Sequence, residues 1–158
     1  MNATAEKKTP GELTADLDFY VIDGKSYRMG LEDGKEIGKR EGIDEYCRNQ
    51  FISVYDLNRT AECAELFIDR FYQKFQECSI LQARLGTNPS HEPTAFFVTD
   101  VPKNKVRDVC DLERDVEFEF SDKNKGNPIC VWSVSGGIVQ NEINADFPFV
   151  RKAVAKNA

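Results

Sequence analysis

A charged stretch of the chain, GLEDGKEIGKREG, carries a glycine at every fourth position: Gly30, Gly34, Gly38 and Gly42. Helix-forming residues stand between the glycines, and opposite charges are spaced four residues apart at Glu36, Arg40 and Asp44. We therefore predict a helix from about Ser26 to Cys47. Because each helical residue turns by about 100°, these glycines lie about 40° apart around the axis, and one flank of the helix is almost bare of side chains.

The bare flank, which extends as far as Tyr46, has a cost that close packing must offset. Each glycine costs about 1 kcal/mol relative to alanine in a helix interior, and a small domain has a total stability of only about 5–15 kcal/mol. A bare backbone lets another surface approach more closely than the usual interaxial distance of about 8–10 Å. That surface is either the apolar face of Phe67, Phe71 and Phe75 or the same flank of a second copy in a homo-oligomer.

The glycine spacing, with LED, KEI and KRE between the glycines, resembles the glycine-striped helices of flagellar export ATPase regulators and of small ribosome-assembly adaptor proteins. The resemblance is confined to this stretch of the chain. It implies assembly with another protein through this helix.

The chain reads as a leader followed by one domain. Residues 1–15 are polar and aperiodic and are predicted to be a flexible leader. Residues 16–158 suffice for one hydrophobic core but would leave two domains marginal, so we predict a single α+β domain. Its second helix is the clearest element, since apolar residues recur at spacings of three and four from Ala64 to Cys78. We expect Thr60 to cap this helix and Gly86 to follow its end.

A small sheet is predicted for the C-terminal half. Residues 94–99 (TAFFVT) read as a buried strand, and Val116, Phe118 and Phe120 alternate with acidic residues as in a half-buried strand. After a turn, residues 129–135 (ICVWSVS) form its partner, with Trp132 packed between the sheet and the helices. Residues 138–143 can add a strand, and residues 149–155 a short C-terminal helix.

The predicted fold is therefore α+β. Two main N-terminal helices pack on one face of a small C-terminal antiparallel sheet of three to four strands. A short helix around Val106, Val109 and Leu112 stands between the strands.

Acidic residues are concentrated between residues 107 and 122, where seven carboxylates accompany two arginines. On a strand, alternate residues share one face, so Asp115, Glu117 and Glu119 are expected to form a solvent-facing acidic surface. Such a surface is a solvated face, a site for a basic protein partner, or a Mg²⁺ site for hydrolysis. The candidate partner-binding residues are Asp111, Asp115, Glu117, Glu119 and Asp122.

Other chemistry finds little support in the sequence. The five cysteines are widely spaced, without a CxxC pair, and read as buried free thiols. His91 is the single histidine and stands in a polar loop, so no catalytic residue, metal site or cofactor is assigned. The net charge of −6 argues against direct nucleic-acid binding. The lack of a long apolar run or a secretory signal predicts a cytoplasmic protein without membrane contact.

These features predict a non-enzymatic protein-binding module of the inhibitor, immunity or adaptor kind. It would act through the acidic strand face, through the glycine-striped helix, or through both, on a protein partner with a basic surface. One alternative is a metal-dependent hydrolase or nuclease that uses carboxylates among Asp108, Asp111, Asp115, Glu117 and Glu119. Another is a secretion-type chaperone.

Overall fold

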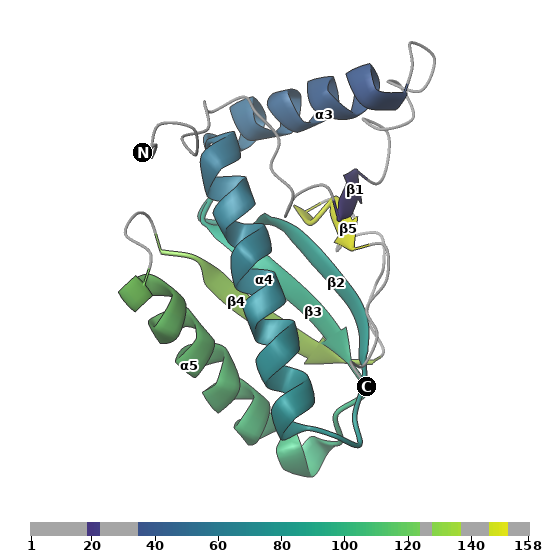
Figure 1. Ribbon diagram of the computed structural model, residues 1–158, viewed down its shortest axis with the longest axis vertical. Helices are drawn as coiled ribbons and strands as arrows, with labels where there is room; N and C mark the ends of the chain where they lie inside the picture. The colour runs from purple at the N-terminus through teal and green to yellow at the C-terminus, as the bar shows by residue number, and fades with distance from the viewer. Residues whose placement is uncertain (1–18, 23–34, 124–127, 137–145, 152–158) are drawn as a thin grey trace, which may run out of the picture.

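The computed structural model describes residues 19–22, 35–123, 128–136 and 146–151 (Figure 1). The elements follow one another along the chain as β1 (Tyr20–Ile22), α3 (Lys35–Gln50), α4 (Val54–Lys74), β2 (Ile80–Thr87), β3 (Pro93–Thr99), the 3₁₀ turn η2 (Lys103–Lys105), α5 (Val106–Lys123), β4 (Cys130–Ser135) and β5 (Phe149–Arg151).

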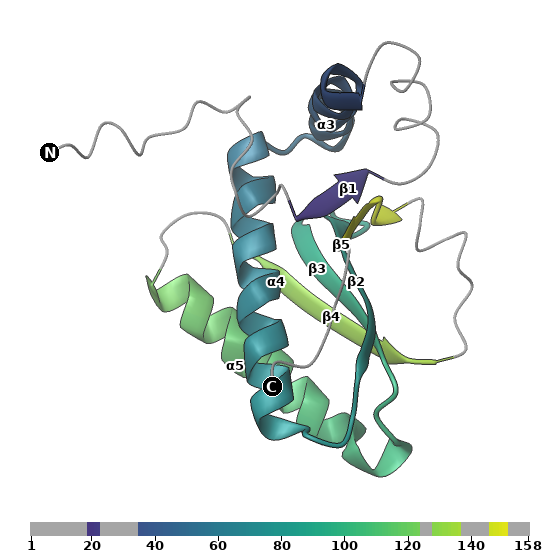
Figure 2. The ribbon, with the colours of Figure 1, turned by 45° about the vertical axis from the view of Figure 1, so that its right-hand side comes forward.

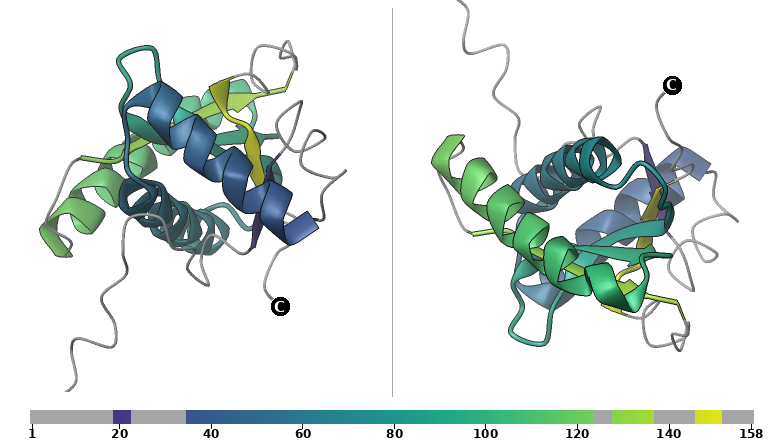
Figure 3. Two further views of the ribbon diagram at one scale, coloured as in Figure 1. Left: turned by 90° about the horizontal axis from the view of Figure 1, so that it is seen from above. Right: turned by 90° about the horizontal axis from the view of Figure 1, so that it is seen from below.

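The strands form one five-stranded sheet in the order β1-β5-β2-β3-β4. All neighbours are antiparallel except β3 and β4, which are parallel and are joined by the crossover that contains α5. Helices α4 and α5 lie side by side over one face of the sheet (Figures 1 and 2). Helix α3 crosses the end of the sheet near β1 and β5 (Figure 3). The predicted α+β class is confirmed, but the predicted antiparallel sheet of three to four strands is wrong, because the observed sheet is mixed and larger.

Helix α4 provides the centre of the core. Its side chains at Leu57, Ala64, Phe67 and Phe71 are fully buried, and the Phe67 ring stacks on that of Phe97 in β3, with 4.3 Å between centroids. The amphipathic face predicted from the spacing is therefore confirmed.

The ends of α4 differ from the prediction. Its N-cap is Ser53, whose side chain accepts a 3.0 Å hydrogen bond from the backbone N–H of Asp56. Thr60 lies inside the helix, where its hydroxyl donates to the carbonyl of Asp56 at 2.7 Å. Gly86 does not follow the helix but lies in strand β2.

Residues 115–121 are helical, so the predicted strand there is wrong. They belong to α5, whose buried residues Val109, Leu112, Val116 and Phe120 follow one another at spacings of three and four. The alternation that suggested a strand is local, whereas the helical period extends over the whole segment. The short helix predicted around Val109 therefore continues through the acidic segment.

Strand β4 lies where the sequence predicted a strand. Its neighbouring strand, and the side of the sheet to which its residues point, differ from the prediction. It pairs with β3 in parallel, with Phe96 opposite Trp132, instead of with residues 115–121. Val131 is fully buried, whereas Trp132 is 41% exposed. Since consecutive residues of a strand point to opposite faces, Trp132 lies on the face away from the helices, and its predicted role between sheet and helices is wrong.

The C-terminal helix expected at residues 149–155 is also wrong for its first three residues, which form β5. This strand is bonded between β1 and β2, with Phe149 opposite Ile22 and Leu85. The leader (1–15) and the strand expected at residues 138–143 lie outside the described residues.

The predicted helix of the glycine-rich stretch is confirmed from Lys35 onward, while Gly30 and Gly34 lie outside the described residues. Gly38 is helical, and Gly42 is buried together with Ile43 and Cys47. The bare flank is therefore covered at Gly42.

Three of the cysteines, Cys47, Cys63 and Cys78, are free and buried as predicted, whereas Cys110 is exposed and Cys130 half-buried.

None of the helices among the described residues combines the length and the apolar character needed to cross a bilayer.

Candidate functional site

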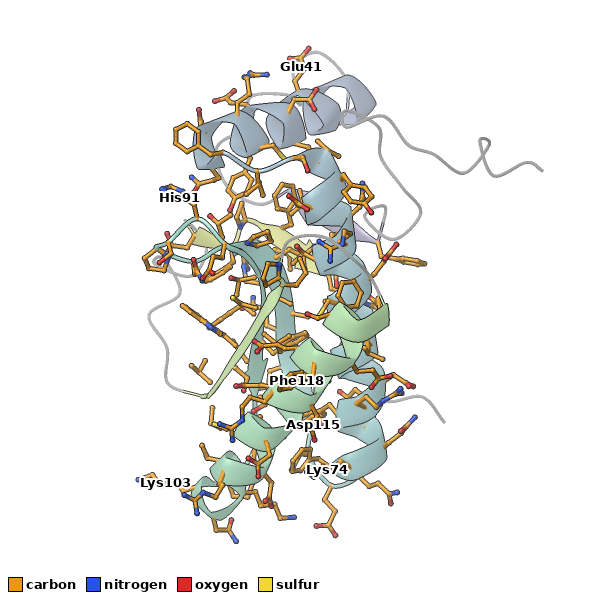
Figure 4. The ribbon with its side chains drawn as sticks, turned by 90° about the vertical axis from the view of Figure 1, so that its left-hand side faces the viewer. Glu41, Lys74, His91, Lys103, Asp115 and Phe118 are labelled. Atoms are coloured by element: carbon orange, nitrogen blue, oxygen red, sulfur yellow. The ribbon has the colours of Figure 1, made fainter. Side chains whose placement is uncertain are left out.

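The outward side of α5 combines an exposed aromatic ring with carboxylates. With about 100° per residue, Asp111, Asp115 and Phe118 fall within about 60° of one another and opposite the buried stripe of the helix. Asp115 is exposed, and the Phe118 side chain is 77% exposed although it is fully apolar. Figure 4 shows both residues along α5. We call this set, Asp111, Asp115 and Phe118, the outer face of α5.

The acidic residues predicted to bind a partner do not lie on one face of α5. Asp111 stays on the surface and pairs with Arg114 at 2.7 Å, where both side chains are largely exposed. Glu119 turns toward α4 and accepts two hydrogen bonds from the guanidinium of Arg70, at 2.6 and 3.3 Å. These bonds raise the pKa of Arg70. Asp122 lies in the last turn of α5, and its side chain is outside the described part.

Glu117 turns to the other side, toward β4. Its carboxylate accepts a 2.7 Å hydrogen bond from the backbone N–H of Val131. Glu117 and Glu119 therefore hold α5 against its neighbours instead of lining a common binding face. The predicted acidic strand face is wrong, and Asp111 and Asp115 are the members of that set with exposed or half-exposed side chains that lie on the outer face.

A further carboxylate, the half-buried Glu113, was not predicted as a site residue. It lies one turn before Glu117 on the same flank of α5, and the hydroxyl of Ser133 in β4 donates to it. Burial raises the pKa of Glu113 to about 7, against the lowering effect of the bonds from Ser133. The four-residue spacing of Glu113 and Glu117 is a signal that could have been recognised once the segment was read as a helix.

A pocket of about 250 Å³ opens beside Phe118. It is lined by Glu117, Phe118, Ser121, Pro128, Ile129 and Cys130. The rings and aliphatic groups among these residues make it suited to an apolar side chain. Burial raises the pKa of Glu117 as well.

Cys130, which lies beside Glu92, is not an activated nucleophile. Burial, followed by the nearby charges of Glu92 and Glu117, raises the pKa of Cys130 to about 11. A thiol with a raised pKa is protonated at neutral pH and is a poor nucleophile. Among the residues with described positions, no three His, Cys, Asp or Glu side chains come together in a way that could hold a metal ion.

Tyr46, predicted to border a self-association surface, is engaged within the chain. Its hydroxyl donates to the carbonyl of Asp146 at 3.0 Å and lies 3.3 Å from the hydroxyl of Thr87. Its ring meets that of Phe149 edge-on, at 5.2 Å between centroids. Tyr46 thus fastens the C-terminal half of α3 to the sheet.

Comparison with known proteins adds no identification: no family model matches the chain, and neither curated proteins nor solved structures show a significant similarity to it. A function is therefore inferred from the residues of the site.

Proposed function

We propose that the protein is a non-enzymatic protein-binding module that recognises its partner through the outer face of α5 and the adjoining pocket. The observation that carries this proposal is the exposure of Phe118. Helix α5 already has a complete buried stripe, so the Phe118 ring adds nothing to the core and costs solubility. Exposed aromatic rings beside an apolar pocket are typical of the central contacts of protein interfaces.

The charge around Phe118 indicates the kind of partner. Asp115 and Asp111 lie about one and two helical turns before Phe118 on the outer face of α5, and the whole chain carries a net charge of −6. Such a field speeds association with a positively charged surface and disfavours acidic competitors. We therefore propose a partner segment with an apolar residue for the pocket and basic residues around it. Inhibitors, immunity proteins and adaptors can all use a surface of this type.

The proposal is tested by cross-linking and capture with matched variants. A photo-reactive amino acid at position 118 should cross-link one defined host protein, which is then purified and titrated against the wild-type chain. Phe118→Ser and Asp115→Lys should each weaken this binding at least tenfold while leaving the melting temperature unchanged.

The controls remove equivalent groups elsewhere. Leu81→Ser removes another exposed apolar side chain, and Glu41→Lys reverses an exposed charge on α3, away from α5 (Figure 4). Both should bind like the wild type. Unchanged affinity of Phe118→Ser for the cross-linked protein would reject the outer face of α5 as the binding surface.

A further inference from the structure

A second pocket, of about 260 Å³, adjoins the first and shares Pro128 with it. It lies where the α3–α4 connection, the first turn of α4 and the turn between β2 and β3 meet. Figure 4 shows His91 at this end of the molecule, beyond the C-terminal half of α5. The residues that matter for its chemistry are Phe51, Asp56, His91, Glu92, Pro93 and Pro128.

The carboxylate of Glu92 is held at this pocket by a buried amide. Asn88 is only 6% exposed, and its side-chain oxygen accepts hydrogen bonds from the backbone N–H groups of Ser90 and Glu92, at 2.9 and 3.0 Å. Its side-chain nitrogen donates to Glu92 Oε1 at 2.8 Å. Asn88 therefore shapes the turn and also orients the acidic side chain, so little ordering remains to be done when a ligand binds.

Two aromatic rings form the rim of the pocket. The rings of Phe51 and His91 meet edge-on, with 5.7 Å between centroids. Both residues have left-handed backbone conformations, with φ of 59° and 62°. The Phe51 side chain is 83% exposed, so its ring is available to a ligand.

Glu92 supplies the charge with which the pocket can bind a ligand. Asp56 is buried and pairs with Arg59 at 3.4 Å, so its charge is balanced within α4. The described partners of Glu92 are neutral: the Asn88 amide and, through a weak 3.8 Å hydrogen bond, the Cys130 thiol. The pocket thus offers a carboxylate, an aromatic ring and proline walls.

We propose that this pocket binds the guanidinium group of an arginine side chain, supplied by the same partner that contacts the outer face of α5. A guanidinium pairs with a carboxylate, stacks on an aromatic ring and carries an apolar stem that suits proline walls. The choice of partner rests on the proposed function, whereas the chemistry of the pocket rests on its own residues.

The test uses the full chain and a small probe, so that it does not depend on the partner. N-acetyl-L-arginine amide is titrated into the ¹⁵N-labelled protein, with N-acetyl-L-citrulline amide as a neutral analogue of nearly the same shape. We expect saturable shifts of the amide signals of Phe51, His91 and Glu92 with the arginine probe, and at least fivefold weaker binding of the citrulline probe.

Four variants complete the test. Glu92→Gln and Phe51→Asn should each weaken binding of the arginine probe at least fivefold, whereas Glu41→Gln, which removes an exposed charge on α3, should not. Phe118→Ser should leave probe binding unchanged, so failure of this pocket and failure of the outer face of α5 are distinguished. Equal binding of both probes, or wild-type affinity in both Glu92→Gln and Phe51→Asn, overturns the proposal.

Discussion

The carboxylate of Glu117 on α5 accepts a 2.7 Å hydrogen bond from the backbone N–H of Val131 on β4. Within the described residues, β4 is paired with β3 alone, and the N–H of Gly136, just after β4, donates to Thr99 of β3. N–H groups alternate in direction along a strand, so that of Val131 faces away from β3. Glu117 therefore covers a donor on an open edge of the sheet, where unpaired groups invite another strand.

This contact predicts a graded effect of two substitutions. Glu117→Ala removes the acceptor of the Val131 N–H and should cost about 1–3 kcal/mol of unfolding free energy. Glu117→Gln keeps an acceptor oxygen and should cost clearly less. Urea unfolding measures both values, and sedimentation velocity should reveal more self-association in the alanine variant. Equal stability of the two variants would contradict the role of Glu117 at the edge.

Glu113 predicts how stability changes with pH. Its folded pKa, about 7, lies above its ordinary value of 4.5, because burial disfavours the charged form. The folded state therefore binds the proton more tightly than the unfolded state, and this contribution is complete below pH 4.5 and is lost as pH rises to about 7. The raised pKa of Glu117 acts in the same direction.

Glu113→Gln removes this titration. Between pH 4.5 and 8 the unfolding free energy of the wild type should fall by about 1–2 kcal/mol more than that of the variant. This difference is smaller than the full pKa shift implies, because the carboxylate is partly exposed. Urea unfolding at several pH values gives the difference between the two curves. Parallel curves would show that Glu113 does not titrate in this range.

At Gly86 we expect the addition of a single methyl group to destabilise the fold. A Cβ at this residue would lie 2.1 Å from the carbonyl oxygen of Asp146 and 2.7 Å from the Cα of Phe147. Backbone atoms cannot move aside as a flexible side chain can, so Gly86→Ala should destabilise by about 3 kcal/mol, at the upper end of overpacking effects.

Gly136 provides the matched control for Gly86. A Cβ there meets nothing within 4 Å, but its φ of +50° is unfavourable for alanine. Gly136→Ala should therefore cost about 1 kcal/mol. Thermal unfolding compares the two variants, and an equal loss would mean that the Asp146–Phe147 segment yields easily.

We expect removal of the Phe51 ring to increase the stability of the fold. Asparagine adopts left-handed backbone conformations more readily than phenylalanine, and the largely exposed ring loses little burial. Phe51→Asn should therefore raise the unfolding free energy by up to about 1 kcal/mol, net of the lost contact with His91. A lower melting temperature would show that the ring stabilises the fold more than its exposure indicates.

Parts of this architecture could be read from local periodicity. The three-and-four spacing around Phe67 and Phe71 identified α4, and the continuous apolar run TAFFVT identified β3. In α4 apolar residues recur at every turn of the helix, and in β3 most residues are apolar. The segment around Phe118 was misread because its three alternating aromatic and aliphatic residues fit a strand. Two of them, Val116 and Phe120, continue the helical spacing of Val109 and Leu112, whereas Phe118 lies on the opposite side of the helix.

The roles of the acidic residues depended on contacts between distant parts of the chain. Glu119 meets Arg70, and Glu117 meets Val131, across separations that no local pattern encodes. A period that extends over a whole segment, as in α4 and β3, thus specifies whether that segment is helical or extended and which of its faces is apolar, since those properties arise from neighbours along the chain. Strand order, the parallel joining of β3 and β4, and the division of the carboxylates into anchors and exposed groups arise from packing in three dimensions.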